Sequence, residues 1–359
     1  MTVPVHAPTA TPWPSGAARG ANGPQALRWT AATVLALAAF VWVLPRTTGA
    51  AWSDVRSVLG DLRPVELLPL VGVWAAGLLA YSFVLTAALP GLTRRRALTL
   101  NLTGSAVSNV APMGGALGVA ANLMMVRAWR FRPSAFAAFT VVTNIWDVMG
   151  KLVLPLVALA AVLVGQGLTS APLQAAAATT CTVLALVLAA MVLTLRSDRV
   201  AGAVGRAGAV VLRWAAPRRM AQRADGFEAA LLDTRARVSA VIARTWLQLT
   251  GGTIAYLALQ GALLWACLHA VGATSPLSVV VAGLAVERLL TLAVITPGGA
   301  GLAEAGSAGV LVALGVDPLT AAAGVLLYRG FTFLLEIPVG GLWLGGWVVA
   351  RARAARRPA

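Results

Sequence analysis

The sequence predicts an all-α polytopic membrane protein with about six full spans and two broken or re-entrant helical segments. Of its 359 residues, 59% are hydrophobic and 11% are charged, which leaves too few polar side chains to cover a water-soluble fold. Apolar runs of about 20 residues recur along the chain, and that length crosses the hydrocarbon of a bilayer. Both observations indicate several helices that lie in a membrane.

The formal net charge of +16 comes mainly from arginines that lie between the apolar runs. They gather at residues 94–96, 127–132 and 351–357. This placement is typical of the positive-inside rule, which puts basic loops on the cytoplasmic side, so nucleic acid is not an expected partner. Ala, Gly, Val and Arg dominate and Lys151 is the single lysine, as in a GC-rich bacterial genome. We therefore expect a multi-pass bacterial cytoplasmic membrane protein with both termini in the cytoplasm.

Three regions are expected along the chain. Residues 1–27 are rich in Pro, Gly and Ala and predict a disordered cytoplasmic N-terminus. Residues 28–350 form the membrane domain, and residues 351–359 form a basic cytoplasmic tail. Small residues at 48–50 leave cleavage after the first span open as an alternative, although the long polar lead-in favours an uncleaved span.

The order of the elements follows from the apolar runs and their flanks. Full spans are expected near residues 29–45, 65–88, 133–164, 172–195, 245–271 and 318–349. An outer loop joins the first two spans. Two further apolar segments, 97–127 and 277–316, are interrupted by Pro and Gly. Residues 196–244 form a basic cytoplasmic connector, either an amphipathic helix on the anionic inner leaflet or a solvated link.

The two interrupted segments share a Pro- and Gly-rich signature. Helix breaks are expected at Pro112, Gly114 and Gly115, and at Pro297, Gly298, Gly299 and Gly301. The first segment has arginine clusters on both sides, so it enters and leaves by one face. The layout predicts an inverted repeat of two halves, about 65–195 and 245–350, which is the sequence pointer to a transporter site near the midplane. The alternative is that Pro and Gly mark only kinks or close packing.

Polar residues of the first half lie on two helical faces. Asn101, Ser105 and Ser108 lead to the first break, and Asn144, Asp147 and Lys151 share a face of the next span. Together they are candidates for a polar path through the membrane. The alternative is structural: Asp147 and Lys151, one turn apart, neutralise each other, and the asparagines hydrogen-bond between helices.

The second half carries five ionisable residues within apolar segments: Glu287, Arg288, Glu304, Arg329 and Glu336. Glu287 and Arg288 are adjacent and need separate partners, whereas Arg329 and Glu336 are seven apart and share a helical face. We expect Glu304 to pair with Arg329 across the second break, leaving guanidinium donors for a phosphate. Glu304, Arg329 and Glu336 are therefore candidates for a substrate path, and the alternative is a buried ion pair that fixes helix register.

No motif of an enzyme active site is present, so the sequence predicts no catalytic activity and no cofactor. Cys181 and Cys267 each lie within an apolar run, while His6 and His269 are far apart. Neither a disulfide framework nor a metal site is expected.

The run from Pro297 to Glu304, followed by Gly315 and then Tyr328-Arg329, resembles the lysylphosphatidylglycerol synthase transmembrane region, also called the flippase-like domain family. The resemblance extends over roughly residues 30–350. The positions that match the family are Pro297, Gly298, Gly299, Gly301, Glu304 and Arg329, and the first break also looks like the family's earlier one, although Met113 makes it less regular. In the family's best-known members a soluble synthase domain follows the membrane region, and we expect a stand-alone member without it.

The resemblance implies movement of a phospholipid or polyprenyl-linked lipid between leaflets, with anionic headgroups of membrane lipids as the expected partners. A different possibility is a non-transporting partner or regulator of a lipid-modifying or glycosyl-transferring enzyme. Apolar surface around the membrane segments would serve lipid contact, a homodimer or an enzyme partner equally well.

Overall fold

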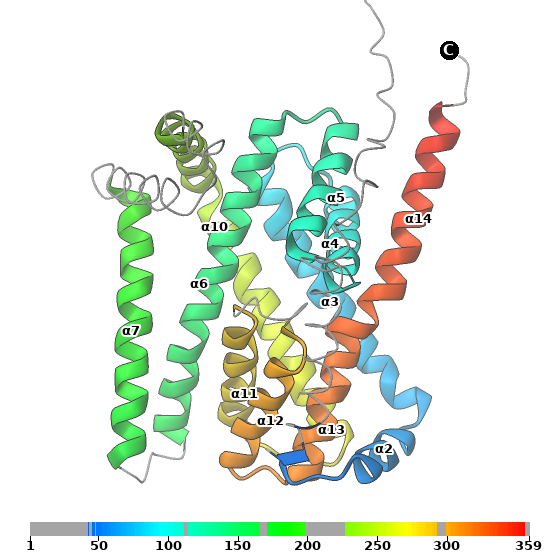
Figure 1. Cartoon of the computed structure of the whole chain (residues 1–359), viewed down its shortest axis with the longest axis vertical. Helices are drawn as coiled ribbons and strands as arrows, with labels where there is room; N and C mark the ends of the chain where they lie inside the picture. The colour runs from blue at the N-terminus through cyan, green and yellow to red at the C-terminus, as the bar shows by residue number, and fades with distance from the viewer. Residues whose placement is uncertain are drawn as a thin grey trace, which may run out of the picture.

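The computed structural model describes residues 42, 45–46, 48–110, 114–165, 171–197, 227–292 and 299–355. All regular elements in these ranges are helical, which confirms the predicted all-α class (Figure 1). In chain order they are α2 (Trp52–Gly60), α3 (Pro64–Ala88), α4 (Arg94–Val110), α5 (Gly114–Ala128), α6 (Pro133–Gly165), α7 (Ala171–Arg196), α10 (Phe227–Ala270), α11 (Leu277–Leu290), α12 (Leu302–Ala313), α13 (Pro318–Arg329), η3 (Gly330–Leu334) and α14 (Glu336–Ala355).

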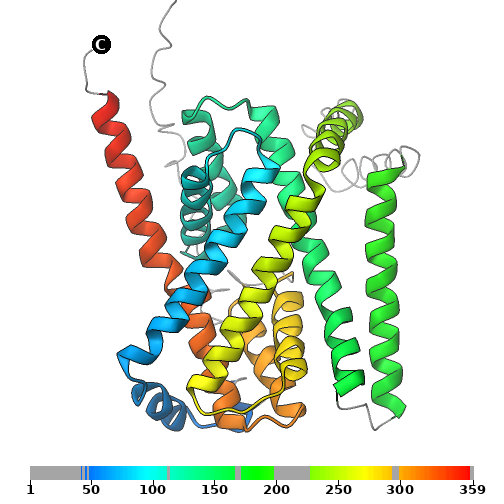
Figure 2. The same ribbon diagram turned by 180° about the vertical axis from the view of Figure 1, so that it is seen from behind.

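Within the described residues, four helical stretches are long and apolar enough to cross a bilayer. They are Pro64–Ala88, Pro133–Ala161, Arg235–Ala270 and Pro318–Arg353, and each matches an expected span. In Figure 2, α3 and α10 lie side by side and run the height of the bundle. Helix α7 occupies the expected span 172–195 and packs on α6 at the edge of the bundle. Most of the expected span 29–45 lies outside the described residues, so the total of six spans stays a prediction.

Two pairs of helices are made of members too short to cross a bilayer alone. Helices α4, α5, α11 and α12 have 17, 15, 14 and 12 residues, or roughly 18–26 Å at 1.5 Å per residue, against a hydrocarbon core of about 30 Å. Figure 1 shows the α4–α5 pair at one end of the bundle and the α11–α12 pair at the other. Each pair is interrupted where the sequence predicts a break, although Pro112, Pro297 and Gly298 themselves lie outside the described residues.

Two apolar cores fill the two ends of the bundle. The upper core, in the orientation of Figure 1, includes Val84, Leu85, Leu89, Leu100, Met125, Val126, Phe136, Phe139, Val142 and Leu249. The lower core includes Leu70, Leu263, Leu264, Leu268, Val279, Val280, Leu284, Leu311 and Val325. Helices α3 and α10 contribute to both cores, and α6 packs Leu154 against the lower one.

Two helices depart from the sequence-based expectation. Helix α2 lies in the expected outer loop and packs Val55 against Val271 and Ala322 across the lower end of the bundle. Helix α10 begins at Phe227 rather than near residue 245, so the last part of the expected connector is helical. At 44 residues, α10 is about 66 Å long, which is roughly twice the hydrocarbon thickness. The rest of the connector, residues 198–226, lies outside the described residues.

A single π-helical turn, η3, separates α13 from α14. Its i→i+5 bond runs from the Leu335 N–H to the Gly330 carbonyl at 2.8 Å. Pro338 lies four residues after Leu334, so it cannot bond that carbonyl, and its ring would clash with a regular α turn. The wider turn holds one residue more than an α turn, so Glu336 is rotated away from the face of Arg329 on which a regular helix would place it.

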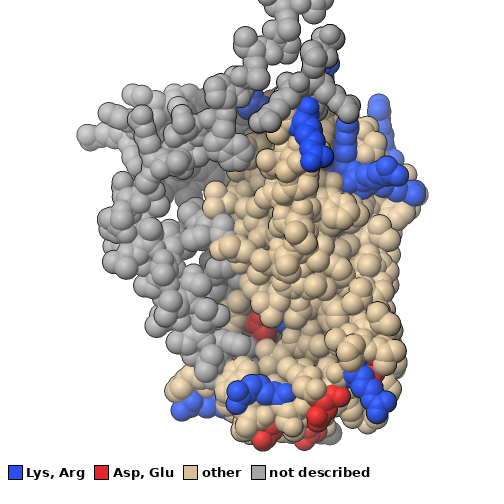
Figure 3. Space-filling view, turned by 90° about the vertical axis from the view of Figure 1, so that its right-hand side faces the viewer, with Lys and Arg blue, Asp and Glu red and all other residues tan. Residues whose placement is uncertain are grey.

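Most charged side chains gather at the two ends of the molecule, and the tan band between them shows only a small patch of red and blue (Figure 3). At the upper end, the helix ends and turns carry Arg94, Arg95, Arg96, Arg127, Arg130, Arg132, Arg351 and Arg353. The lower end carries both signs, in α2, in the turn that follows it and before α13. A band with little surface charge between polar ends is what a bilayer requires of the chain that crosses it.

Candidate functional site

Polar residues form a layer between the two apolar cores. Along α3, Tyr81 lies between Leu70 and Val84; along α10, Tyr256 lies between Leu249 and Leu263. The central polar layer, as we call it, comprises Tyr81, Asp147, Lys151, Thr253, Tyr256, Gln260, Glu287, Arg288, Glu304, Tyr328 and Arg329. All three tyrosines of the chain belong to it.

Glu304 and Arg329 pair across the second break, as the sequence predicts. The Arg329 Nε donates to Glu304 Oε1 at 2.6 Å, and its Nη1 donates to Glu287 Oε1 at 3.3 Å. The exposed fractions of Glu287, Glu304 and Arg329 are 1%, 5% and 8%. One guanidinium is thus held between two buried carboxylates from two different helices.

Arg288 extends this network to a fourth helix, α10. Its Nη2 donates to the Tyr328 hydroxyl at 2.7 Å, and that hydroxyl donates to Gln260 Oε1 at 3.1 Å. Its Nε also lies 3.0 Å from Glu287 Oε2, but the two atoms are not aligned for a hydrogen bond, so this is a contact of opposite charges. Glu287 and Arg288 each have a separate partner, as their adjacent positions predict, and their charged groups also contact each other.

Two of the charges stand at helix ends that favour them. Glu304 is in the first turn of α12 and Arg288 is in the last turn of α11, which matches the sign of each helix dipole. The second Glu304 oxygen accepts the Gly301 N–H at 2.6 Å. The entry to α12 also needs glycine, because the φ angles of Gly299 and Gly301 are +70° and +92°, where side chains are strained.

The four charges of this ion network, Glu287, Arg288, Glu304 and Arg329, sum to zero. Its three most buried members line neither of the cavities described below. The geometry therefore supports the structural alternative for Glu304 and Arg329, in which they fix α11, α12 and α13 relative to one another, and direct contact of either residue with a headgroup stays a prediction.

A cavity of about 260 Å³ lies between α3, α4, α5 and α6. Its polar lining includes Asn101, Ser105, Ser108, Asn122, Thr140 and Asn144. It reaches the surface of the described chain at Gly115, Val119 and Asn144, which are exposed. The polar residues that the sequence places before the first break are thus brought together with Asn144 of α6.

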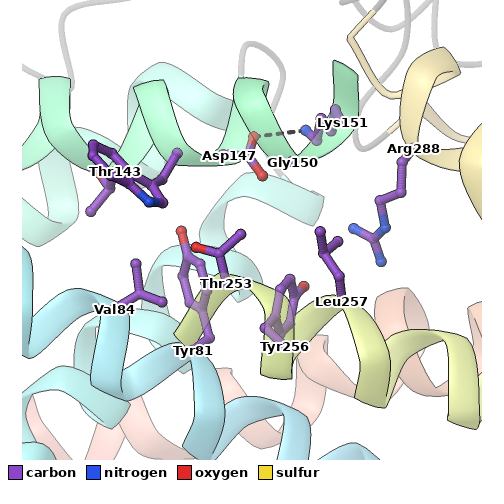
Figure 4. A pocket seen from close by; sticks show the side chains of 11 residues that line it. Tyr81, Val84, Thr143, Asp147, Gly150, Lys151, Thr253, Tyr256, Leu257 and Arg288 are labelled. Atoms are coloured by element: carbon purple, nitrogen blue, oxygen red, sulfur yellow. Dashed lines mark ion pairs between the residues drawn. The ribbon is translucent and has the colours of Figure 1, made fainter. Parts of the chain in front are cut away.

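A smaller hollow of about 10 Å³, the size of about one water, adjoins the cavity and shares Tyr81 and Thr143 with it. Figure 4 shows Asp147 and Lys151 joined along α6, with Arg288 reaching toward the same space from α11. The Lys151 Nζ to Asp147 Oδ2 distance is 2.8 Å. The expected neutralisation of Asp147 by Lys151 is confirmed, and the hollow places both near the ion network.

Glu336 lies where the two halves meet. Its carboxylate lies near Ser105 of α4 and Trp74 of α3, and near enough to Arg288 and Arg329 to sense their charges. The expected common face of Arg329 and Glu336 is wrong in detail, because the π turn rotates the two apart. Glu336 instead connects the cavity of the first half with the ion network of the second.

Glycines allow the short helices of the first half to pack closely. A Cβ on Gly114 would collide with the Ser108 backbone, and one on Gly118 would lie 2.8 Å from the Gly104 carbonyl. A Cβ on Gly115, by contrast, would meet no atom within 4 Å. The first break therefore combines close packing at Gly114 with an open position at Gly115 on the rim of the cavity.

Several residues of the site were not singled out from the sequence. They are Tyr81, Asn109, Asn122, Thr253, Tyr256 and Gln260. Their residue types are rare in this chain, and that rarity could have identified them. Four of the five asparagines of the chain line the cavity, and every tyrosine lies within a membrane segment. No group of three or more potential metal ligands occurs within the described ranges.

A comparison with curated proteins finds no match to this chain. The family model described as "Lysylphosphatidylglycerol synthase TM region" matches residues 29–340. This range contains both short helix pairs, the cavity and the ion network, and it confirms the resemblance carried by the residues from Pro297 to Arg329. The chain therefore belongs to the family of the lysylphosphatidylglycerol synthase transmembrane region.

Proposed function

We propose that this integral membrane protein moves lipid headgroups between the two leaflets, along the central polar layer and without a covalent step. The observation that carries the proposal is the cavity of about 260 Å³, lined by amides and hydroxyls and open at Gly115, Val119 and Asn144. A polar headgroup loses its water when it crosses hydrocarbon, at a cost of about 2–7 kcal/mol for each unpaired polar group. A cavity with polar lining groups beside the upper core offsets that cost.

The arrangement of the short helices supports two gates on opposite sides. The α4–α5 pair lies at the arginine-rich end and the α11–α12 pair at the other, as expected for inverted halves around a midplane site. By the positive-inside rule the arginine-rich end faces the cytoplasm. In this proposal the cavity beside α4 and α5 receives a headgroup from the cytoplasmic side.

In this proposal the ion network affects the headgroup path through residues that lie beside that path. Glu336 lies near Ser105 on the cavity wall, and Arg288 lines the adjoining hollow. Glu304 and Arg329 hold the helices that carry these two residues, so they act on the path by positioning. Membrane lipids are the proposed partners.

The test is leaflet exchange of fluorescent phospholipids and a polyprenyl phosphate in liposomes that contain the purified protein. Asn144→Leu removes the exposed amide at the cavity mouth, and Thr182→Val on α7 is its matched control. Both side chains are exposed and donate to the carbonyl four residues earlier in their own helix, at 2.7 and 2.9 Å. We expect exchange by the parent chain, a reduction of about fivefold or more by Asn144→Leu, since one hydrogen bond contributes about 1 kcal/mol, and no change by Thr182→Val.

Equal loss in both variants would mean that the cavity is not the path. Absence of exchange with every lipid, in a folded protein, would contradict the proposal and favour the other possibility, a membrane partner or regulator of a lipid-modifying or glycosyl-transferring enzyme. Activity that requires an added enzyme would identify that role.

A further inference from the structure

We infer that the headgroup unit entering the cavity is uncharged and rich in hydroxyl groups, about the size of one sugar ring. This inference rests on the proposed function and names its substrate class. Among the described residues that line the cavity, every polar side chain is an amide or a hydroxyl, and none carries a formal charge. Four of them are asparagines, out of five in the whole chain.

The lining matches hydroxyl groups better than it matches ions. Each amide side chain offers two N–H donors and a carbonyl acceptor, and a sugar hydroxyl both donates and accepts. A phosphate or carboxylate needs a cation or several N–H donors directed at it. The adjoining hollow has two cations, but Lys151 is paired with Asp147 at 2.8 Å and Arg288 lies 3.0 Å from Glu287.

The same reasoning excludes an amine as the unit bound in the cavity. An ammonium group needs carboxylates around it, and Glu336 lies near Ser105 from outside the lining. The sequence predicts an anionic headgroup, but the described lining of the cavity contains no cation that would bind one. A phosphate that links a sugar to its lipid would lie outside the cavity.

One acceptor in the cavity wall points directly to a missing donor. The Oδ1 atom of Asn122 is buried and has no hydrogen-bond partner within the part of the chain that the structure describes. An unpaired buried carbonyl is costly, and a ligand hydroxyl would supply the donor if the Asn122 amide turned toward the cavity. Asn122 comes from α5 and lies opposite Gly104 of α4.

The volume limits the unit to a single ring. Cavities for drug-sized ligands span about 300–1,000 Å³, and this one, at about 260 Å³, lies just below that range. The exposed Val119 and Gly115 at its mouth are apolar, so they let a lipid chain continue into the bilayer while the ring stays inside.

The experiment measures binding separately from transport. Purified protein in detergent is titrated with dioctanoyl lipids that share their chains, namely a glucosyl diacylglycerol, phosphatidic acid and phosphatidylethanolamine, and thermal stabilisation gives each affinity. We expect the glucosyl lipid to bind at least tenfold more tightly than the other two. Asn144→Leu should weaken glucosyl-lipid binding about fivefold, and Thr182→Val should not.

A second variant keeps the test decisive if Asn144→Leu does not fold. Asn144→Asp keeps the shape of the side chain but adds a charge, so it should shift the preference from the glucosyl lipid toward phosphatidylethanolamine. Equal affinities for the three lipids, or tighter binding of phosphatidic acid, would overturn the inference. Selective glucosyl-lipid binding without leaflet exchange would uphold the inference about the substrate and refute the proposed function. Leaflet exchange without selective binding would uphold the proposed function and refute the inference.

Discussion

Removing the Arg329 charge should leave a buried negative charge that the protein cannot compensate. The guanidinium contacts Glu304 at 2.6 Å and Glu287 at 3.3 Å, and all three residues are at most 8% exposed. The four charges of the ion network sum to zero, so Arg329→Gln leaves a net charge of −1 among them. Breaking a buried ion pair on one side typically costs about 3–5 kcal/mol, and we expect a loss of that size.

Removing the Glu304 charge as well should restore much of the loss. In the double variant Glu304→Gln/Arg329→Gln the network is neutral again, and the amide oxygen of the substituted side chain would still accept the Gly301 N–H that Glu304 now accepts. The double variant should therefore be more stable than Arg329→Gln alone, with a coupling energy of about 1–3 kcal/mol. The measurement is unfolding of the purified protein in mixed micelles, followed by circular dichroism.

A matched control is available on the surface. Glu66 accepts the Arg63 N–H at 3.0 Å in the same helix-entry geometry, but it is exposed. Glu66→Gln should change the free energy of unfolding by no more than about 0.5 kcal/mol. If the losses of Glu304→Gln and Arg329→Gln simply add in the double variant, the two residues do not act as a pair and the reasoning is refuted.

Two further predictions concern packing and capping. A Cβ at Gly340 would collide with the Leu102 carbonyl, whereas one at Gly341 would meet no atom within 4 Å. Gly340→Ala should therefore lower stability by about 1–3 kcal/mol and Gly341→Ala should not, in the same unfolding assay; equal effects would mean that α14 does not pack closely on α4. Asp317 caps α13 by accepting the Thr320 N–H at 3.0 Å. Asp317→Ala should cost about 1 kcal/mol and Asp317→Ser much less, and a loss shared by both variants would point away from capping.

The long helices and the second break were predictable because few alternatives exist for them. An apolar run of about 20 residues is best explained as a helix that spans the membrane. The Glu304–Arg329 pair followed from a similar constraint: two isolated charges within apolar segments need partners, and the glycines around 299–301 indicate the turn that brings them together.

Other features depend on how helices align in space, which the sequence shows weakly. Helix α2 has nine residues and buries one valine, so its pattern is too short to stand out from a loop. The π turn changes the spacing rule between Arg329 and Glu336. The cavity combines Asn122 of α5 with Asn144 of α6, and no local period joins residues on separate helices. The inverted repeat stays a prediction supported by the opposite placement of the short pairs.

The ion network also bears on how the chain enters the membrane during synthesis. A charged residue at the centre of a lone inserting helix costs about 2.5–3.5 kcal/mol, so four of them would cost about 10–14 kcal/mol if α11, α12 and α13 partitioned one at a time. Glu287 and Glu304 precede Arg329 in the chain, so two carboxylates reach the insertion machinery before the guanidinium that contacts both. The three helices should therefore leave the translocon as one unit, and a nascent chain halted before α13 should be held back from the lipid.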